Sequence, residues 1–441
     1  MTSRTARRKR GQILTETGLE KIKEAIAKAF PNGYTLPDIS ARTERTHSAD
    51  NPKSSNFVSN DTISHILNRR AGADKSKLES LFRAFGLNLE PDDHKAAADH
   101  FGHQAANSNQ RQDWGEAPDV SVFYGRTEEL AKLEQWILTD RCRLVLLWGM
   151  AGIGKRFLSV KLAQQITDKF EYTIWRSLRH APPIQDILTD LIEFFSDEQE
   201  TDLPTTVASG ISRLIKCLQT NRCLVVLDGV ETVQERRYPE RYQEYEMLFR
   251  QVGESEHRSC LVLTSSEKPR EIDLLESRTG PVRSYKIQGL TLDAAREILR
   301  EVGLVDENEW DSIIEHYRSN PLYLKIVSAC IVKIFAGKAS NFIEKNTTFL
   351  GRIEKVLEQQ FEQIHNLEIK VMRQLAIARD SLGIDQLRSE ISPPISTSKL
   401  MEALDSLLCL SLIEKITEGD EDLFTLQPVV RKYVINRFGQ I

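Results

Sequence analysis

A short glycine-rich segment, GMAGIGK at residues 149–155, has the residue types needed to bind phosphate. Glycines let the main chain approach an anion closely and adopt positive φ, so that successive N–H groups surround the phosphate oxygens. The apolar run RLVLLW precedes the segment, and KRFLSVKLAQQI follows it with a helical pattern. A helix N-terminus adds its positive dipole end, and the lysine reaches the β- and γ-phosphates. This context predicts a nucleotide phosphate site formed by Gly149, Met150, Ala151, Gly152, Ile153, Gly154 and Lys155.

The next position departs from the phosphate-loop pattern, because Arg156 stands where serine or threonine is usual. The usual hydroxyl coordinates Mg²⁺, which bridges the β- and γ-phosphate oxygens. Arginine cannot ligate a cation and would repel it, although its guanidinium could offset phosphate charge directly. We therefore expect nucleotide binding to survive this substitution and ordinary Mg²⁺ handling to suffer.

A second candidate group follows the apolar run RCLVVLD, 73 residues after the lysine. Asp228 ends this run and is the natural partner for Mg²⁺ or its water shell. The next position, where a second acid often orients the attacking water, is Gly229. Glu231 lies on the following turn, where it is either a substitute for that acid or a solvated turn residue. The catalytic candidates are therefore Asp228 and Glu231, and Asp228 is also the metal candidate.

Alternating strands and helices must position these residues. Apolar strand candidates separated by amphipathic helices occur at 143–148, 171–178, 222–228, 259–265 and 283–290. Such runs are typical of a parallel sheet covered on both faces. After residue 291 the pattern is helical, and near the C-terminus two short strands flank an acidic, glycine-containing turn. The predicted fold class is an α/β P-loop NTPase core with a parallel sheet, followed by helical lid and winged-helix domains.

The segment before this core reads as capped, short amphipathic helices, which predicts a small all-α domain with a helix-turn-helix-like arrangement. A polar, Gln/Asn-rich stretch then predicts a linker, because it cannot bury enough apolar surface to fold alone. We divide the chain into an N-terminal module, a linker, a nucleotide-binding domain, a lid and a winged helix at 1–95, 96–120, 121–290, 291–348 and 349–441.

Composition is that of a globular protein, with 40% hydrophobic and 28% charged residues. The net charge is −5, yet residues 1–95 carry 17 basic and 12 acidic side chains. A basic module on an acidic body suggests a nucleic-acid or acidic-protein partner for that module. Six widely spaced cysteines fit small buried side chains in a reducing cytoplasm. We find no secretory signal and no run of 18 apolar residues, so we expect a cytoplasmic protein without membrane contact.

The order of these motifs resembles the NB-ARC branch of the STAND signal-transduction ATPases, in the cyanobacterial-type group, over about residues 119 to 438. FYGRTEEL precedes the phosphate loop, SCLVLTSSEKP follows Asp228, and SNPLYLK and FTLQPVV come after residue 300. The resemblance implies that adenine and ribose contact Phe123, Gly125, Arg126 and Pro321. Ser266 stands where the family has an arginine that senses the γ-phosphate. Gln427 stands where it has a histidine that touches the β-phosphate of ADP.

The resemblance implies a switch that closes over ADP and opens with ATP, permitting homo-oligomerisation. Cyanobacterial-type members often add β-propeller repeats, which this sequence does not contain. Because the residues that bind are kept and those that handle metal and water are replaced, we expect ADP or ATP binding with weak or absent hydrolysis. Two alternatives stay open: a sequence-specific DNA-binding regulator on a degenerate ATPase-like scaffold, and an active ATPase with unusual metal handling through Glu231.

The N-terminal module also resembles phage-repressor helix-turn-helix domains and the modules attached to many bacterial STAND proteins. A recognition helix presents polar residues at its start to base edges, and nearby basic residues contact phosphates. By position the DNA-binding candidates are Ser59, Asn60, Thr62, His65, Arg69 and Arg70, with Lys75 as a further phosphate contact. The alternative is a protein–protein adaptor that keeps the fold without the groove contacts.

Overall fold

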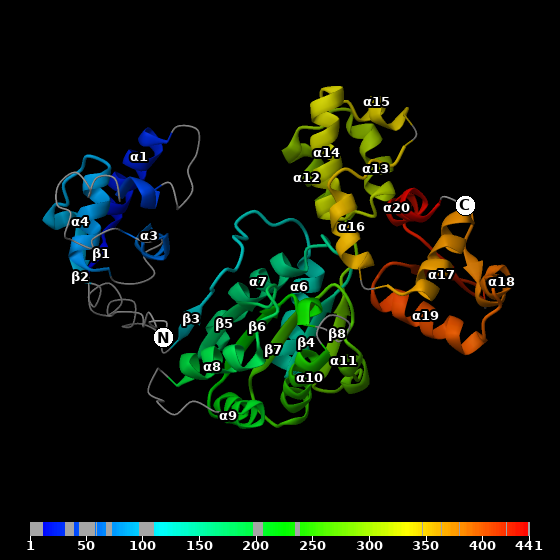
Figure 1. Cartoon of the computed structure of the whole chain (residues 1–441), viewed down its shortest axis with the longest axis horizontal. Coiled ribbons are helices and arrows are strands. Elements are labelled where there is room, and N and C mark those ends of the chain that lie inside the picture. The colour runs from blue at the N-terminus through cyan, green and yellow to red at the C-terminus, as the bar shows by residue number, and fades with distance from the viewer. Residues whose placement is uncertain are drawn as a thin grey trace. The chain divides into compact units, whose positions relative to one another are not determined.

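The computed structural model describes residues 12–30, 39–43, 58, 60–67, 73–96, 110–196, 206–233, 239–345, 347–362, 364–378, 380–419 and 421–439. The chain divides into two compact units, Met1–Asn109 and Gln110–Ile441, whose elements are labelled in Figure 1. Within the described residues, no helix combines the length and the apolar character needed to span a bilayer.

The first unit contains helices α1 (Glu16–Ala29), α3 (Asn60–Leu67) and α4 (Lys75–Ala84), together with a helical segment at 39–43. Thr15 caps α1 by accepting a hydrogen bond from the Gly18 N–H, as the sequence predicts. Apolar side chains at helical spacing form one core, which includes Ile22, Ile63, Leu78 and Phe82. The helical stripes therefore bury their apolar faces against one another.

The prediction that this unit is all-α is wrong. Strand β1 (Gln12–Leu14) pairs antiparallel with β2 (His94–Ala96), which follows the short helix η1 (Pro91–Asp93). An ion pair of 2.8 Å between Lys21 and Asp93 joins α1 to η1. The two ends of the described part of this unit, residues 12–14 and 94–96, are therefore paired, which a helix-period search cannot detect in strands of three residues.

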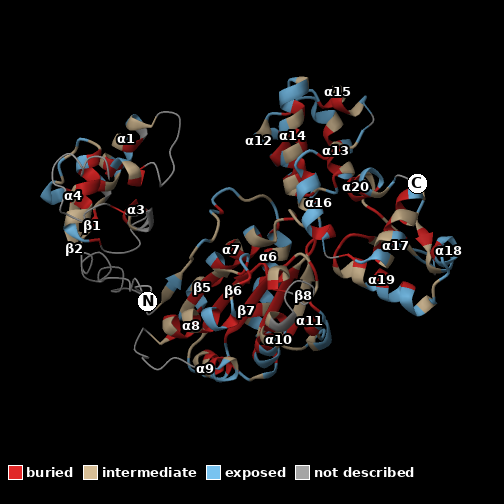
Figure 2. Cartoon of the chain, in the orientation of Figure 1, coloured by how far each residue is buried: buried red, intermediate tan, exposed pale blue. Residues whose placement is uncertain are grey.

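The second unit is built on a parallel sheet of six strands in the order β3-β5-β6-β7-β4-β8. Their bounds are β3 (Arg111–Asp113), β4 (Leu144–Trp148), β5 (Tyr172–Ser177), β6 (Cys223–Asp228), β7 (Cys260–Ser265) and β8 (Val282–Lys286). All five strand candidates of the sequence are present. Figure 2 shows the buried strands between helices.

Alternate side chains of β4 serve two separate cores, as a doubly covered sheet requires. Leu144 and Leu146 pack with α8 (Ile184–Phe195), α9 (Val207–Thr220) and α10 (Pro239–Glu254). Val145 and Leu147 pack with α6 (Thr127–Glu134) and α7 (Lys155–Ile166). The short helix η2 (Gln135–Thr139) contributes Ile137 to the α6–α7 core, and η3 (Thr167–Lys169) follows α7. The short helix η4 (Val230–Val233) and helix α11 (Arg270–Leu275) contribute to the core on the other face.

The predicted linker over 96–120 is too long at its C-terminal end, because β3 adds an edge strand to the sheet. Trp114, Ala117 and Val120 contribute to the core on the α6–α7 face. Asp113 forms an ion pair of 2.9 Å with Arg176 of β5. These apolar and charged side chains attach residues 110–120 to the second unit.

The rest of the unit is mainly helical and shares one continuous core. It contains α12 (Leu292–Val302), η5 (Glu307–Glu309), α13 (Trp310–His316), α14 (Pro321–Phe335), α15 (Ala339–Ile343), α16 (Ile353–Phe361), α17 (Asn366–Ile377), α18 (Ile384–Glu390), α19 (Thr397–Cys409) and α20 (Pro428–Phe438). Strand β9 (Leu382–Gly383) pairs with β11 (Glu421–Thr425), which pairs with β10 (Glu414–Glu418).

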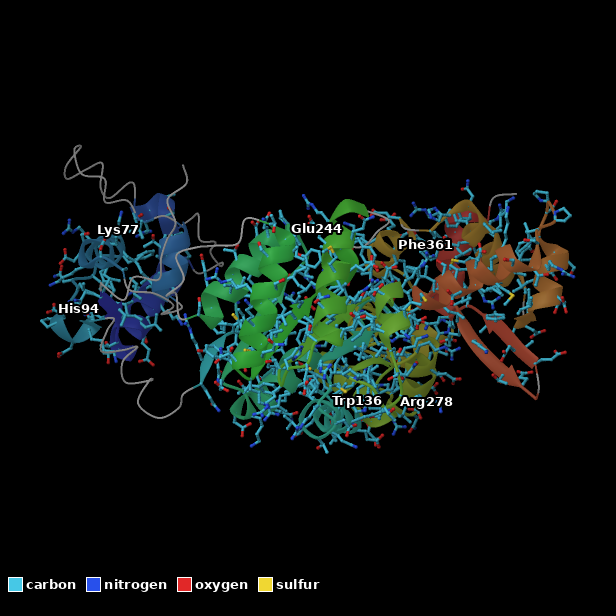
Figure 3. The ribbon with its side chains drawn as sticks, turned by 90° about the horizontal axis from the view of Figure 1, so that it is seen from below. Lys77, His94, Trp136, Glu244, Arg278 and Phe361 are labelled. Atoms are coloured by element: carbon cyan, nitrogen blue, oxygen red, sulfur yellow. The ribbon has the colours of Figure 1, made fainter. Side chains whose placement is uncertain are left out.

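The two strands expected around the acidic turn are β10 and β11, and Gly419 between them has the positive φ of 62° that such a turn favours. Phe361, labelled in Figure 3, packs on Tyr433 of α20 with ring centroids 4.7 Å apart. The helical C-terminal region is thus confirmed, and its division into lid and winged helix stays a prediction.

Candidate functional site

The glycine-rich loop joins the carboxyl end of β4 to the start of α7. Gly149, Gly152 and Gly154 have φ of 143°, 81° and 103°, a region that side chains rarely allow. A Cβ at Gly149 would lie 2.9 Å from the Ile287 carbonyl oxygen, and one at Gly152 would lie 2.7 Å from the Leu322 Cβ. The glycines are therefore required both by the backbone conformation and by close packing.

Lys155 begins α7 and folds back over the loop. Its Nζ donates to the carbonyl oxygens of Gly149, at 2.7 Å, and of Met150, at 3.0 Å. Burial lowers the pKa of Lys155 to about 8, although the carboxylates of Glu231 and Asp228 act in the opposite direction. The sequence predicts that this lysine faces a phosphate, and in the structure it lies at the loop with a reduced tendency to hold its proton.

Arg156 lies beside Asp228 rather than pointing away from the sheet. Its Nε is 3.2 Å from Asp228 Oδ2, and its Nη2 donates to the Glu116 carbonyl oxygen at 3.2 Å. The guanidinium carbon lies 4.8 Å from the ring centroid of the buried Trp175. Arg156 is therefore held by an ion pair, a hydrogen bond and a cation–π contact at once.

Asp228 ends β6 and is buried, as the sequence predicts for the acid of this site. Its Oδ1 accepts a hydrogen bond of 2.7 Å from Thr264 Oγ1 on β7. Besides Arg156, a second cation, Arg179, lies 3.9 Å from Oδ2. Both carboxylate oxygens thus already have protein partners.

Glu231 is half-buried on η4, so the interpretation of a solvated turn residue does not describe its surroundings. Its Oε2 accepts a hydrogen bond of 3.2 Å from the Ser266 N–H. Burial raises the pKa of Glu231, and the Lys155 ammonium opposes that shift. The structure therefore brings together Lys155, Glu231 and Ser266, three residues that the sequence places on separate motifs.

The segment before α6 braces the loop. Arg126 is buried, donates from Nη2 to the Ile153 carbonyl oxygen at 3.0 Å, and forms an ion pair of 2.7 Å with Glu129. Gly125 has φ of 61°, and a Cβ there would lie 2.8 Å from the Ala294 Cβ on α12. Phe123 packs in the α6–α7 core. These residues therefore connect the loop with the start of the helical region.

Helix α14 rests directly on the loop. Asn320 caps this helix by accepting hydrogen bonds from the Leu322 and Tyr323 N–H groups, and its Nδ2 donates to the Ala151 carbonyl oxygen at 3.0 Å. The Pro321 ring lies 3.9 Å from where a Cβ on Gly154 would stand. Sequence reasoning selected Pro321 and missed Asn320, although an asparagine before proline at a helix start is a capping signal.

Gln427, at the start of α20, is hydrogen-bonded to Glu414 of β10. Its Nε2 donates to Glu414 Oε1 at 3.1 Å, and Glu414 also forms an ion pair of 2.9 Å with Arg318. Arg318 and Ser319 both have positive φ, 51° and 50°, in the turn before Asn320. Arg318, Glu414 and Gln427 thus join the α13–α14 turn to β10 and α20. Of these three residues, sequence reasoning selected Gln427 alone.

A cavity of about 550 Å³ adjoins the loop at Met150 and Ile153. Its other walls are residues 286–290, Leu292, one side of α13 with the turn that follows it, Ser411, Ile413, Glu414 and Gln427. Lys286, Arg318, Glu414 and the buried Ser411 supply polar atoms that sequence reasoning missed. Lys155, Arg126 and Asp228 are not among the lining residues, so the cavity flanks the phosphate loop on one side.

The DNA-binding candidates of the first unit fall largely outside the described residues. This applies to Ser59, Arg69 and Arg70 as a whole and to the side chains of Asn60 and His65 on α3. Thr62 is half-buried on the same helix, and Lys75 is exposed at the start of α4. The DNA-binding interpretation stays a prediction.

Comparison with known proteins agrees with this geometry. Residues 126–308 match the NB-ARC domain family. The chain is 42% identical over 349 residues, 75% of its length, to an uncharacterized WD repeat-containing protein of Nostoc sp., and spans 27% of that protein. It is 31% identical over 96 residues, 20% of its length, to the disease resistance protein RPM1 of Arabidopsis thaliana, and spans 10% of that protein.

A solved structure shares the fold of the second unit. The Walker-type ATPase PABY2304 of Pyrococcus abyssi superposes with a TM-score of 0.51 at 17% identity, over 70% of this chain and 95% of that one. The glycine-rich loop, the parallel sheet and the matched domain family agree on a P-loop NTPase core. Residues 126–308 of this chain are therefore identified as an NB-ARC domain.

Proposed function

We propose that this chain is an adenine-nucleotide switch, which binds ADP or ATP with weak or absent hydrolysis and controls its N-terminal unit. The observation that carries the proposal is the loop at 149–154, whose three glycines keep the positive φ values of an anion-binding turn. Within the described residues, Lys155 Nζ donates to two carbonyl oxygens of that loop, those of Gly149 and Met150. A phosphate at this position would offer the ammonium group a stronger, charged partner.

The residues present fit a nucleotide. Helix α7 begins after Gly154, which has no side chain to cap it, so its first N–H groups are suited to an anion. The adjoining cavity of about 550 Å³ falls in the range typical of small-molecule sites. Gly125, Arg126 and Pro321 surround the same loop, in agreement with the adenine and ribose contacts expected for the family.

We expect weak hydrolysis because the carboxylates that would have to position a metal ion and a water molecule already have protein partners. Asp228 already accepts from Thr264 and pairs with Arg156. The following residue is Gly229, and the Glu231 carboxylate accepts from the Ser266 N–H. Without a free acid in either role, the charge that develops during phosphoryl transfer lacks the stabilisation that ATPases use.

Control of the N-terminal unit is supported by residues 110–120, which directly follow it in the chain. This segment contributes β3 to the nucleotide-binding sheet. Its Glu116 carbonyl oxygen accepts a hydrogen bond from Arg156 in the first turn of α7. A change at the phosphate loop therefore has a short covalent and hydrogen-bonded route to the connection between the two units.

Calorimetric titration of the full chain with ADP, ATP and GDP tests the proposal. We expect adenine nucleotides to bind at one site with higher affinity than GDP, and phosphate release from ATP to stay near background. Light scattering after size exclusion, in ADP and then ATP, reports whether the assembly state responds. Absence of binding by ADP and ATP would overturn the proposal, and rapid phosphate release lost in Asp228→Asn would replace it with an active ATPase.

A further inference from the structure

Arg156 occupies the position from which phosphate-loop proteins coordinate Mg²⁺. It follows Lys155 in the first turn of α7, where the usual serine or threonine hydroxyl binds the metal ion. Its guanidinium is held on three sides by Asp228, Trp175 and the Glu116 carbonyl oxygen. A cation is therefore already fixed at this place by the fold.

The charges around Asp228 do not fit a divalent metal ion. Two guanidinium groups, those of Arg156 and Arg179, lie 3.2 and 3.9 Å from the same carboxylate oxygen. The other oxygen accepts from Thr264. A magnesium ion takes oxygen ligands and would face two cations here. Among the described residues, no group of three or more His, Cys, Asp or Glu side chains is placed to hold a metal ion.

Arg156 nevertheless keeps one donor that could serve an anion. Its Nε is buried and makes no hydrogen bond with the described residues, because its approach to Asp228 is an ion pair without hydrogen-bond alignment. A buried donor without an acceptor is costly, and an added phosphate oxygen would remove that cost. The Arg156 side chain as a whole is 21% exposed, so part of it is open to a ligand, while Nε itself is buried.

We propose that this chain binds its nucleotide without Mg²⁺, and that the Arg156 guanidinium supplies the positive charge that the metal ion supplies in other phosphate-loop proteins. This inference rests on the proposed nucleotide binding, and it adds that this binding does not require a metal ion. A fixed organic cation neutralises phosphate charge but provides no exchangeable water or ligand sites. The bound nucleotide is therefore kept rather than turned over.

The test compares ADP affinity in EDTA and in excess Mg²⁺ for the full chain and for Arg156→Thr. The wild-type affinity is expected to be the same in both conditions. In Arg156→Thr, the affinity in EDTA should fall about tenfold to a hundredfold, as for a lost charge-assisted hydrogen bond, and Mg²⁺ should recover part of it. Mn²⁺, followed by its magnetic resonance signal, should associate with the ADP-loaded variant and not with the ADP-loaded wild type.

Arg222→Thr is the matched control. Arg222 stacks on the buried Phe170, with 4.9 Å between its guanidinium carbon and the ring centroid, and precedes β6 at the end opposite Asp228. The Arg222→Thr variant should bind ADP with the same affinity in EDTA and in excess Mg²⁺. Arg156→Gln, which is closer to arginine in size, serves if the threonine variant does not fold.

The possible outcomes separate the two proposals. Wild-type ADP binding that requires Mg²⁺ would overturn this inference and leave the nucleotide switch standing. Metal-independent binding that persists undiminished in both Arg156 variants would also overturn it, because the charge would then come from elsewhere. No ADP binding in either condition would overturn the proposed function itself.

Discussion

Raising the pH from 7 to 9 should weaken ADP binding by about tenfold, because Lys155 loses its proton over this range. Burial lowers the pKa of Lys155 to about 8 in the nucleotide-free chain. A bound phosphate favours the charged ammonium and raises that pKa. Where the pH lies between the two values, binding must take up a proton, so the affinity falls as the pH rises through 8.

The size of the effect follows from the protonated fraction of Lys155 before binding. With a pKa of about 8, this fraction is about nine-tenths at pH 7 and about one-tenth at pH 9. The ratio corresponds to about 1.4 kcal/mol of binding free energy. The carboxylates of Glu231 and Asp228 oppose the effect of burial on Lys155, but burial is the largest of the three causes and sets the sign.

Calorimetry at pH 7, 8 and 9, in buffers of different ionisation enthalpy, measures both affinity and proton uptake. We expect uptake to approach one proton per ADP at pH 9. Lys155→Arg is the control, because a guanidinium stays charged throughout and its affinity should not depend on pH. A constant wild-type affinity with no proton uptake would refute the role assigned to Lys155.

Three further predictions follow from the packing around the site. Trp175→Ala removes a fully buried indole and should lower the free energy of unfolding by about 3–5 kcal/mol in chemical denaturation, whereas a loss below about 1 kcal/mol would contradict the packing described. Gly152→Ala places a Cβ 2.7 Å from Leu322 at a φ of 81°, so the rise in melting temperature caused by ADP should disappear; an unchanged rise would show that the loop adapts freely. Arg318→Ala should cost no more than about 1 kcal/mol, because its pair with Glu414 is partly exposed, and a double-mutant cycle with Glu414→Ala that gives a much larger coupling energy would be inconsistent with a solvent-screened pair.

The phosphate loop and the sheet could be predicted from the sequence because their signals are local. A six-residue apolar run, glycines at fixed spacing and a lysine at a helix start each act within a few residues of one another. The buried strands are apolar on both faces, and β4 divides its side chains between two cores as that pattern requires. Asp228 was likewise found from its place at the end of such a run.

The partners of Arg156 and Gln427 could not be predicted in the same way. Arg156 contacts Glu116, Trp175 and Asp228, which lie far apart in the chain on the loop after β3, on β5 and on β6 respectively. Its effect on the site therefore depends on the sheet order and not on any local motif. Gln427 is bonded to Glu414, a pairing created when α20 returns to the β10–β11 hairpin.

Short edge strands were missed for a different reason. β1, β2 and β3 have three residues each, too few for a period-2 pattern to stand out. They form through pairing with strands distant in sequence: β3 pairs with β5, and β1 pairs with β2, which lies at the other end of the described part of the first unit. Tertiary context, rather than intrinsic propensity, decides such segments.

The central claim is that the main-chain turn at 149–154, together with the ammonium group of Lys155, holds a nucleoside diphosphate. Titration of nucleotide-stripped chain with ADP, in parallel with Lys155→Ala, tests it most directly. The account predicts saturable binding to one site that weakens at least about tenfold in the variant, as for a lost charged hydrogen bond. Equal heats and equal affinities in the two proteins, or no heat in either, would contradict it.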